Sequence, residues 1–126
     1  MGDLTKNFDK SEMQCKCGCG TDWVSHEFIM KLQKAREIAN IPFRITSGCR
    51  CPSRNKHEGG TYNSDHITTD SNACEAADIA CSNSHDRFIM IKAGLEAGFN
   101  RFGIGKSFIH FGMSSTNAQK VIWLYD

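Results

Sequence analysis

Two histidines and one aspartate stand where their side chains could hold a metal ion together. His66 lies in a polar segment, Asp78 in the apolar run AADI, and His110 in the run FIHF. Two imidazoles and a carboxylate form a ligand set of catalytic zinc sites, which leave the fourth position to a water whose pKa falls to about 7. Spacing alone leaves other interpretations open: a solvated loop histidine, a hydrogen-bonded core histidine, and an aspartate engaged in a cap or ion pair.

Two main helices are predicted from capping residues and apolar periodicity. Ser25 is a suitable N-cap for a helix that continues to about Asn40, and Ser84 for a second helix that reaches Ala97, with Gly98 as its left-handed C-cap. The apolar stripe of the first helix is expected to comprise Phe28, Leu32, Ala35 and Ala39. The apolar face of the second is expected to comprise Phe88, Ile91 and Leu95.

Short apolar runs predict the strands that would carry the ligands. The expected strands span residues 41–46, 76–81, 101–105, 108–111 and 121–125. Because side chains alternate on a strand, His110 should share a face with Phe108 and oppose Ile109 and Phe111. The polar run from Pro52 to Asn72 is expected to be a long loop. This pattern predicts a small single α+β domain over residues 1–126, with a mostly antiparallel sheet and two main helices.

The composition excludes several classes of protein. The chain has 126 residues, and 15 Lys and Arg against 14 Asp and Glu give a net charge of +1, which offers no global attraction to nucleic acid. No run approaches the roughly 20 apolar residues of a membrane helix, and the start MGDLTKNFDK lacks the apolar core of a secretory signal. We therefore expect no nucleic acid partner, no membrane insertion and no signal peptide.

Seven cysteines are many for a chain without an apparent export signal. In a reducing compartment thiols more often bind metal than form structural disulfides, and an odd number cannot pair fully within one chain. Five of them are expected to brace the N-terminal loop against the segment GCRC: Cys15, Cys17, Cys19, Cys49 and Cys51. A second, structural metal, a disulfide and plain buried thiols all remain open, since the single residue between the first cysteines is tight for zinc.

Four motifs occur in the order ITSGCRCPSRN, SDH, EAADI and GIGKSFIHF. Together they resemble the core motifs of the zinc D-Ala-D-Ala peptidases, which share the fold of the hedgehog signalling domain and include phage endolysins. The N-terminal NFDKSEMQCKCGCG and the helix segment from Leu32 to Arg36 are also similar to the phage-type members. The resemblance extends from about Phe8 to Phe111.

This resemblance implies a role for each matching residue. His66, Asp78 and His110 would bind a catalytic Zn²⁺. Arg50 would bind the carboxylate or a carbonyl of the substrate and stabilise the oxyanion, which suits a permanently charged guanidinium with a rigid fork of donors. Ser64 would hydrogen-bond the substrate or steady the ligand loop. The alternatives are a surface arginine paired with an acid and an ordinary turn serine.

The chain departs from the family pattern in two places. The interval between His66 and Asp78 is longer than usual, and we expect the inserted segment, which includes Cys74, to sit at the mouth of the site. The family commonly has an acid three residues before the last histidine and often another two residues after it, where this chain has Ser107 and Gly112. We expect slow catalysis unless another acid substitutes.

Three nearby acids could take the place of the missing general base. We choose Glu75, because it lies three residues before Asp78, ahead of Asp65 and Asp70. His57 and His85 are expected to be surface residues.

The implied function is a zinc metallopeptidase that hydrolyses peptidoglycan stem peptides, as a D,D-carboxypeptidase or an endopeptidase of the lysin type. We expect it in the cytoplasm of the producing cell, released at lysis or carried in a virion. One alternative is a zinc-containing binding module of the same fold with weak or no catalysis. Another is a cysteine-rich structural domain without a catalytic metal.

Overall fold

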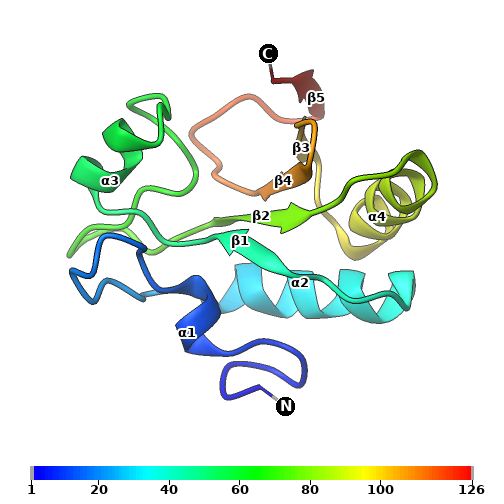
Figure 1. The fold of residues 1–126 in the computed structure, drawn as a ribbon, viewed down its shortest axis with the longest axis horizontal. Helices are drawn as coiled ribbons and strands as arrows, with labels where there is room; N and C mark the ends of the chain where they lie inside the picture. Colours follow the sequence, from blue (N-terminus) through cyan, green and yellow to red (C-terminus); the bar gives the residue numbers. More distant parts are fainter. Residues whose placement is uncertain (1, 126) are drawn as a thin grey trace.

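The computed structural model describes residues 2–125 and is built around a five-stranded sheet with the order β1-β2-β4-β3-β5 (Figure 1). The strands are β1 (Ile45–Ser47), β2 (Ala76–Ala80), β3 (Arg101–Ile104), β4 (Phe108–Gly112) and β5 (Val121–Leu124). β3 and β5 pair in parallel, and the other neighbouring strands are antiparallel. The predicted α+β class and the mostly antiparallel sheet are confirmed.

The helices are α1 (Lys10–Met13), α2 (His26–Ala39), α3 (Pro52–His57) and α4 (Ser84–Ala97). The capping of α2 is as predicted, because the Ser25 hydroxyl accepts a hydrogen bond from the Phe28 N–H at 3.2 Å. Gly98 ends α4 in the left-handed conformation, with φ of 108°, also as predicted. No helix in residues 2–125 is long and apolar enough to cross a membrane.

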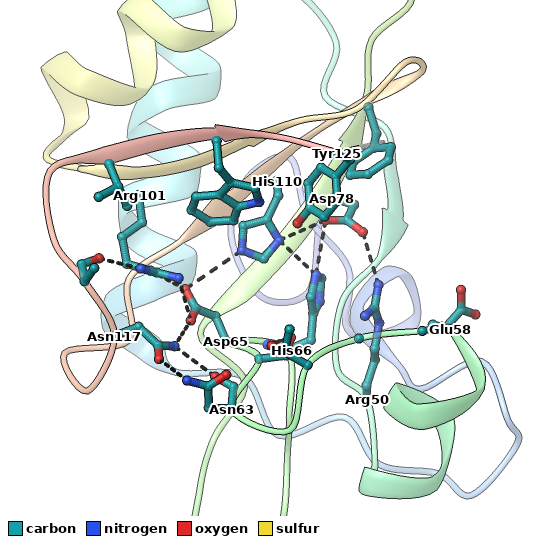
Figure 2. A pocket seen from close by; sticks show the side chains of 18 residues that line it. Arg50, Glu58, Asn63, Asp65, His66, Asp78, Arg101, His110, Asn117 and Tyr125 are labelled. Atoms are coloured by element: carbon teal, nitrogen blue, oxygen red, sulfur yellow. Dashed lines mark hydrogen bonds and ion pairs between the residues drawn. The ribbon is translucent and has the colours of Figure 1, made fainter.

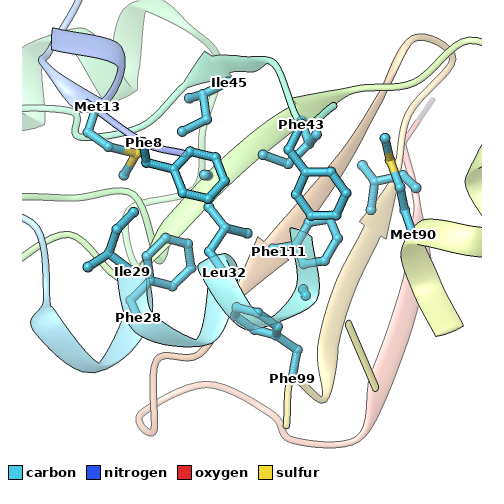
Figure 3. Packing of buried hydrophobic residues seen from close by; sticks show 14 of the residues in the cluster. Phe8, Met13, Phe28, Ile29, Leu32, Phe43, Ile45, Met90, Phe99 and Phe111 are labelled. Carbon is cyan, nitrogen blue, oxygen red and sulfur yellow. The ribbon is translucent and has the colours of Figure 1, made fainter. Parts of the chain in front are cut away.

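The hydrophobic core lies between the sheet and the helices α2 and α4 (Figures 1 and 3). Phe28 and Leu32 of α2 are fully buried, as the apolar stripe predicts. From β4, Ile109 and Phe111 point into the same core, and the Phe111 ring contacts Phe99 edge-to-face at 5.3 Å between centroids. Strand alternation therefore turns the residue between them, His110, to the opposite face of the sheet.

The predicted apolar face of α4 is wrong. Phe88 and Leu95 are exposed, and the buried residues are Met90, Ala93, Gly94 and Ala97. A Cβ on Gly94 would lie 2.6 Å from the Phe102 ring, so α4 approaches the sheet too closely for large side chains. Small residues therefore make the contact, and the larger apolar residues remain outside.

Two predicted boundaries also differ from the structure. β1 begins only at Ile45, although Phe43 is buried as the alternation predicts. The N-cap of α4 is Asn83 rather than Ser84, because its side chain accepts a hydrogen bond from the Asp86 N–H at 2.8 Å.

The polar run that was expected to be a loop contains the helix α3. Pro52 occupies its first turn, and the sulfur of Cys51 accepts a hydrogen bond from the Arg54 N–H at 3.4 Å. In α3 only Asn55 is buried, so this helix depends on its cap and on polar contacts. The sequence of α3 therefore shows no apolar stripe from which this helix could have been predicted.

Candidate metal centre

β2 and β4 place two of the predicted ligands directly opposite each other. These strands are antiparallel neighbours, and their register pairs Asp78 with His110. The third ligand, His66, is in the loop between α3 and β2, beside the segment that follows β1: the Arg50 N–H donates to the His66 carbonyl at 3.0 Å. Three segments distant in sequence thus meet on the face of the sheet away from the core (Figure 2).

The three side chains converge through single donor atoms. His66 Nε2, His110 Nδ1 and Asp78 Oδ1 are each 3.1 Å from the other two. The edge of a tetrahedral zinc site with N and O ligands is about 3.3 Å, so this triangle fits one ion with a fourth position facing outward. All three residues are buried, which excludes the solvated-histidine interpretation of His66.

Hydrogen bonding leaves His66 ready to act as a ligand. Its Nδ1 lies 2.7 Å from the Gly48 carbonyl, which can only accept, so the ring presents the Nε2 lone pair to the centre. Burial lowers the pKa of His66 and keeps the ring neutral. Burial opposes ionisation of Asp78 too, but its interactions with the His66 and His110 rings, each 3.1 Å from Oδ1, hold the pKa of Asp78 well below its usual range.

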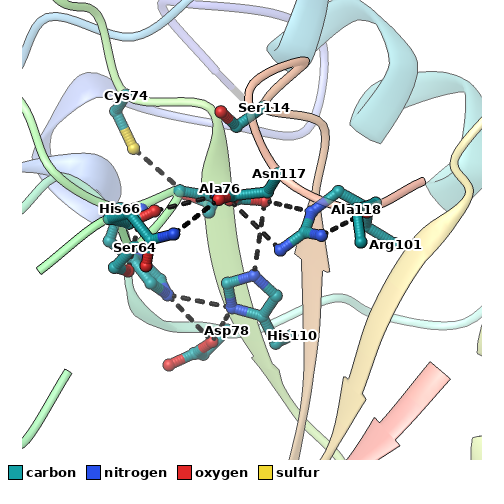
Figure 4. Close-up of polar contacts among 12 residues, drawn as sticks. Ser64, His66, Cys74, Ala76, Asp78, Arg101, His110, Ser114, Asn117 and Ala118 are labelled. Atoms are coloured by element: carbon teal, nitrogen blue, oxygen red, sulfur yellow. Dashed lines mark hydrogen bonds and ion pairs between the residues drawn. The ribbon is translucent and has the colours of Figure 1, made fainter. Parts of the chain in front are cut away.

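A buried carboxylate, Asp65, stands behind the predicted ligand His110 (Figure 2), on the side where Arg101 and Asn117 also lie (Figure 4). Asp65 Oδ2 is 3.9 Å from His110 Nε2, the ring nitrogen that faces away from the triangle. Arg101 Nε donates to the same oxygen at 2.9 Å, and Asn117 Nδ2 donates to Oδ1 at 2.6 Å. Arg101 and Asn117 therefore hold the Asp65 carboxylate next to the outer ring nitrogen of His110, where it can help to orient this ring.

The absence of a side chain at Gly112 makes room for Asp65. A Cβ at this position would lie 2.0 Å from Asp65 Oδ2 and 2.8 Å from His110 Nε2. The resemblance implies an acid at position 112, two residues after the last ligand. In this chain a carboxylate from position 65 occupies the space beside the outer nitrogen of His110, and the glycine accommodates it.

The ionisation of Asp65 should make the metal-free protein sensitive to acid. Burial opposes its charge, but His110, Arg101 and Asn117 outweigh this and lower its pKa from 3.8 to about 2. Because the pKa of Asp65 is lower in the folded than in the unfolded protein, its ionised carboxylate stabilises the fold at pH values above the unfolded-state pKa of 3.8. This stabilisation, at most about 2 kcal/mol, is lost as the pH falls toward 2. We expect urea titrations of metal-free Asp65→Asn to show a smaller loss of stability over this range than wild type; equal losses would contradict this assignment.

Arg50 lies buried beside the centre rather than on the surface. Its Nε donates to Ser47 Oγ at 3.0 Å, Nη1 to Asn55 Oδ1 at 3.3 Å, and Nη2 to Asp78 Oδ2 at 3.2 Å. A guanidinium has five N–H donors, so further N–H groups remain available to a ligand. One alternative for Arg50 was a surface arginine paired with an acid. It does form an ion pair, but it is buried, and its partner is the predicted metal ligand Asp78.

A cavity of about 570 Å³ opens over the triangle and Arg50. Its wall includes four residues that the sequence analysis missed: Arg101, Asn117, Trp123 and Tyr125. Trp123 packs against His110 with ring centroids 5.4 Å apart, and the Arg101 guanidinium lies 5.0 Å from the Trp123 ring centroid. The alternation of Trp123 and Tyr125 places them on one face, a signal that could have identified them.

The structure brings Ser64 into the site but not Glu75. Ser64 lines the cavity, and its Oγ accepts a hydrogen bond from the His66 N–H at 3.2 Å, which fits a role in steadying the ligand loop. Glu75 is not in the cavity wall, and its backbone joins Asp65 to Met113. Asp70 is exposed and likewise outside the wall.

The inserted segment does not sit at the mouth of the site. No residue of 67–75 lines the cavity. Cys74 is fully buried in the core, and its backbone hydrogen-bonds to Trp23 and Ser25, which directs the segment toward the N-terminal part of the chain. A tight turn between Thr69 and Asn72 takes up the additional length.

A sequence model of the family described as peptidase M15 matches residues 6–112. The matched stretch contains the triangle, Arg50 and Ser64, and it ends before β5 with its aromatic residues. A search of curated proteins found no match.

Proposed function

Because the chain belongs to the peptidase M15 family, which is zinc-dependent, we propose that it is a zinc peptidase that hydrolyses peptidoglycan stem peptides in the manner of a lysin. The observation that carries this proposal is the triangle of donor atoms from His66, Asp78 and His110 beneath an open cavity. A triangle with a free fourth position suits a catalytic rather than a structural zinc site.

The bound zinc ion, Arg50 and Tyr125 would each have a separate role in peptide hydrolysis. When bound, zinc supplies Lewis acidity to the scissile carbonyl and to the attacking water. Arg50 is held by Ser47, Asn55 and Asp78, and it directs its remaining N–H groups at the substrate carbonyl or carboxylate. Burial raises the pKa of Tyr125, so its hydroxyl stays protonated and serves as a hydrogen-bond donor at the wall (Figure 2).

The proposal is tested with defined muropeptides and mass spectrometry of the products. Release of terminal D-alanine identifies a D,D-carboxypeptidase, and cleavage within a cross-link identifies an endopeptidase. We expect a chelator to abolish product formation and added zinc to restore it. Undiminished product from the chelated protein would contradict the proposal.

One observation favours a second function. Ser107 and Gly112 stand where the resemblance implies acids, and neither side chain accepts a proton at neutral pH. The alternative is a zinc-containing binding module of the same fold. Zinc-loaded protein that binds muropeptides in calorimetry and yet leaves them uncut would establish it in place of the peptidase.

Arg50→Lys is expected to slow hydrolysis at least about tenfold while the zinc content stays unchanged. Lysine keeps the charge but cannot reproduce the fork that joins Ser47, Asn55 and Asp78. Rates on a muropeptide and zinc analysis of the same sample check this expectation. If the variant instead lost zinc while the hydrolysis rate per bound zinc ion stayed unchanged, the role of Arg50 would be to hold the metal ligand Asp78 in place.

Glu58 takes over from Glu75 as the candidate proton acceptor. Among residues 2–125, the carboxylates in the cavity wall are Asp65, Asp78 and Glu58. The first two are engaged around the metal ligands, whereas Glu58 pairs within this part of the chain only with Arg54, at 2.5 Å, at the rim. We expect Glu58→Gln to lower the turnover rate about a hundredfold, within the range for a general base. Glu75→Gln is the matched control and should leave the rate unchanged. A slow Glu75→Gln variant beside an unaffected Glu58→Gln variant would identify Glu75 as the general base instead.

A further inference from the structure

A second group of possible metal ligands lies away from the cavity, where the loop after α1 meets the start of α3. The sulfur atoms of Cys15, Cys17, Cys19 and Cys51 all lie within 4.8 Å of one another. Cys49, which was expected to join this group, is instead in the hydrophobic core and donates to the Trp23 carbonyl at 3.7 Å. The structure thus selects four of the five cysteines.

We propose that Cys15, Cys17, Cys19 and Cys51 bind a structural zinc ion, separate from the ion at His66, Asp78 and His110. Three sulfur–sulfur separations are 3.5, 3.9 and 3.6 Å, for Cys15–Cys17, Cys15–Cys51 and Cys17–Cys51. Ligands about 2.3 Å from a tetrahedral zinc ion are about 3.8 Å apart. These three separations are nearly equal, so no pair among Cys15, Cys17 and Cys51 stands out as a disulfide. Cys19 Sγ lies within 4.8 Å of the other three, as the fourth ligand of one centre would.

Glycines make the short spacing of the first three cysteines possible. Gly18 and Gly20 have φ values of 87° and 84°, a left-handed conformation that other residues rarely adopt. The loop is closed by a hydrogen bond from the Cys15 N–H to the Thr21 carbonyl at 2.7 Å. The chain therefore turns tightly enough for alternate residues to direct their sulfurs to one point.

Backbone N–H groups stabilise two of these sulfurs. The Cys51 N–H donates to Cys15 Sγ at 3.5 Å, and the Arg54 N–H donates to Cys51 Sγ at 3.4 Å. Thiolates, not thiols, are zinc ligands, and hydrogen bonds to the charged form favour it. The second of these bonds also caps α3, so metal binding and the start of that helix share one sulfur.

The proposed ion would tie the N-terminal loop to the substrate-binding side of the fold. Cys51 follows Arg50 directly, and the Cys49 N–H donates to the Met13 carbonyl at 2.8 Å. The α3 residue Asn55 in turn accepts a hydrogen bond from Arg50. Zinc at the four cysteines thus positions the Arg50 segment without touching the substrate.

Metal analysis of the purified protein tests the site. We expect a second zinc ion per chain in the wild type, and its loss in the double variant Cys17→Ser/Cys19→Ser, which changes exposed loop residues. His110→Ala should lose the other ion and keep this one, so failure of the proposed peptidase site and failure of this proposal are distinguishable. Cys81→Ser, at a buried cysteine outside the cluster, is the matched control and should keep both ions.

Cobalt(II) provides a second readout that does not depend on activity. His110→Ala loaded with cobalt should show sulfur-to-cobalt charge transfer and the intense visible bands of a tetrahedral thiolate site, and the double cysteine variant should lack them. Retention of the second zinc ion in that variant would overturn the proposal. Iron in place of zinc would overturn it as well, as would a disulfide among these cysteines, found as a mass change on reduction.

Discussion

His110→Ala is expected to remove zinc from the centre under the cavity and to lower the rate of muropeptide hydrolysis about a thousandfold or more. Metal activation of a carbonyl and a water is worth several kcal/mol of transition-state stabilisation, and each 1.36 kcal/mol is a factor of ten in rate. His110 supplies one corner of the triangle and is the ligand that Asp65 supports. The checks are zinc content per chain and initial rates at matched protein concentration.

The control for this variant is His85→Ala, at an exposed histidine near the start of α4. It should retain both the zinc and the rate of the wild type. Circular dichroism separates a lost ligand from a lost fold, because His110 lies on the polar face of β4 and not in the core. Equal product from His110→Ala and wild type would refute the peptidase proposal.

Gly112→Ala is expected to lower the free energy of unfolding of the metal-free protein by about 3 kcal/mol and to weaken zinc binding. The new Cβ would lie 2.0 Å from Asp65 Oδ2, and insertion of a methyl group into packed structure typically costs about 1–3 kcal/mol. Asp65 cannot move away without losing its contacts with Arg101 and Asn117. Urea denaturation gives the stability, and competition with a chromogenic chelator gives the zinc affinity.

Paired substitutions test the physical cause. If the new methyl group clashes with the Asp65 carboxylate, the double variant Gly112→Ala/Asp65→Ala should lose less unfolding free energy than the sum of the losses in the two single variants. Asp65→Gly combined with Gly112→Asp returns a carboxylate to the strand and should bind zinc more tightly than Asp65→Gly alone. A Gly112→Ala protein as stable as wild type would show that this space is not restricted.

The sequence contained most of the information on which residues could be ligands and which elements carry them. Imidazole and carboxylate chemistry made His66, Asp78 and His110 candidates, and the resemblance of their flanking motifs to the zinc D-Ala-D-Ala peptidases selected them before any fold was known. The cap at Ser25 and the alternation around His110 are local patterns, and both are confirmed. The sequence did not predict α3, because its cap is a cysteine sulfur and it has no apolar stripe.

Only the tertiary structure decided how these residues meet. The register that sets Asp78 opposite His110 joins strands separated in the chain by α4 and β3. The placement of the Asp65 carboxylate beside Gly112 is likewise visible only in the folded chain. The same holds for the four sulfurs, since Cys49 and Cys51 flank Arg50 alike in the sequence, yet only Cys51 faces the N-terminal loop. Such contacts are stabilised by packing between distant segments, which leaves no periodic pattern in either one.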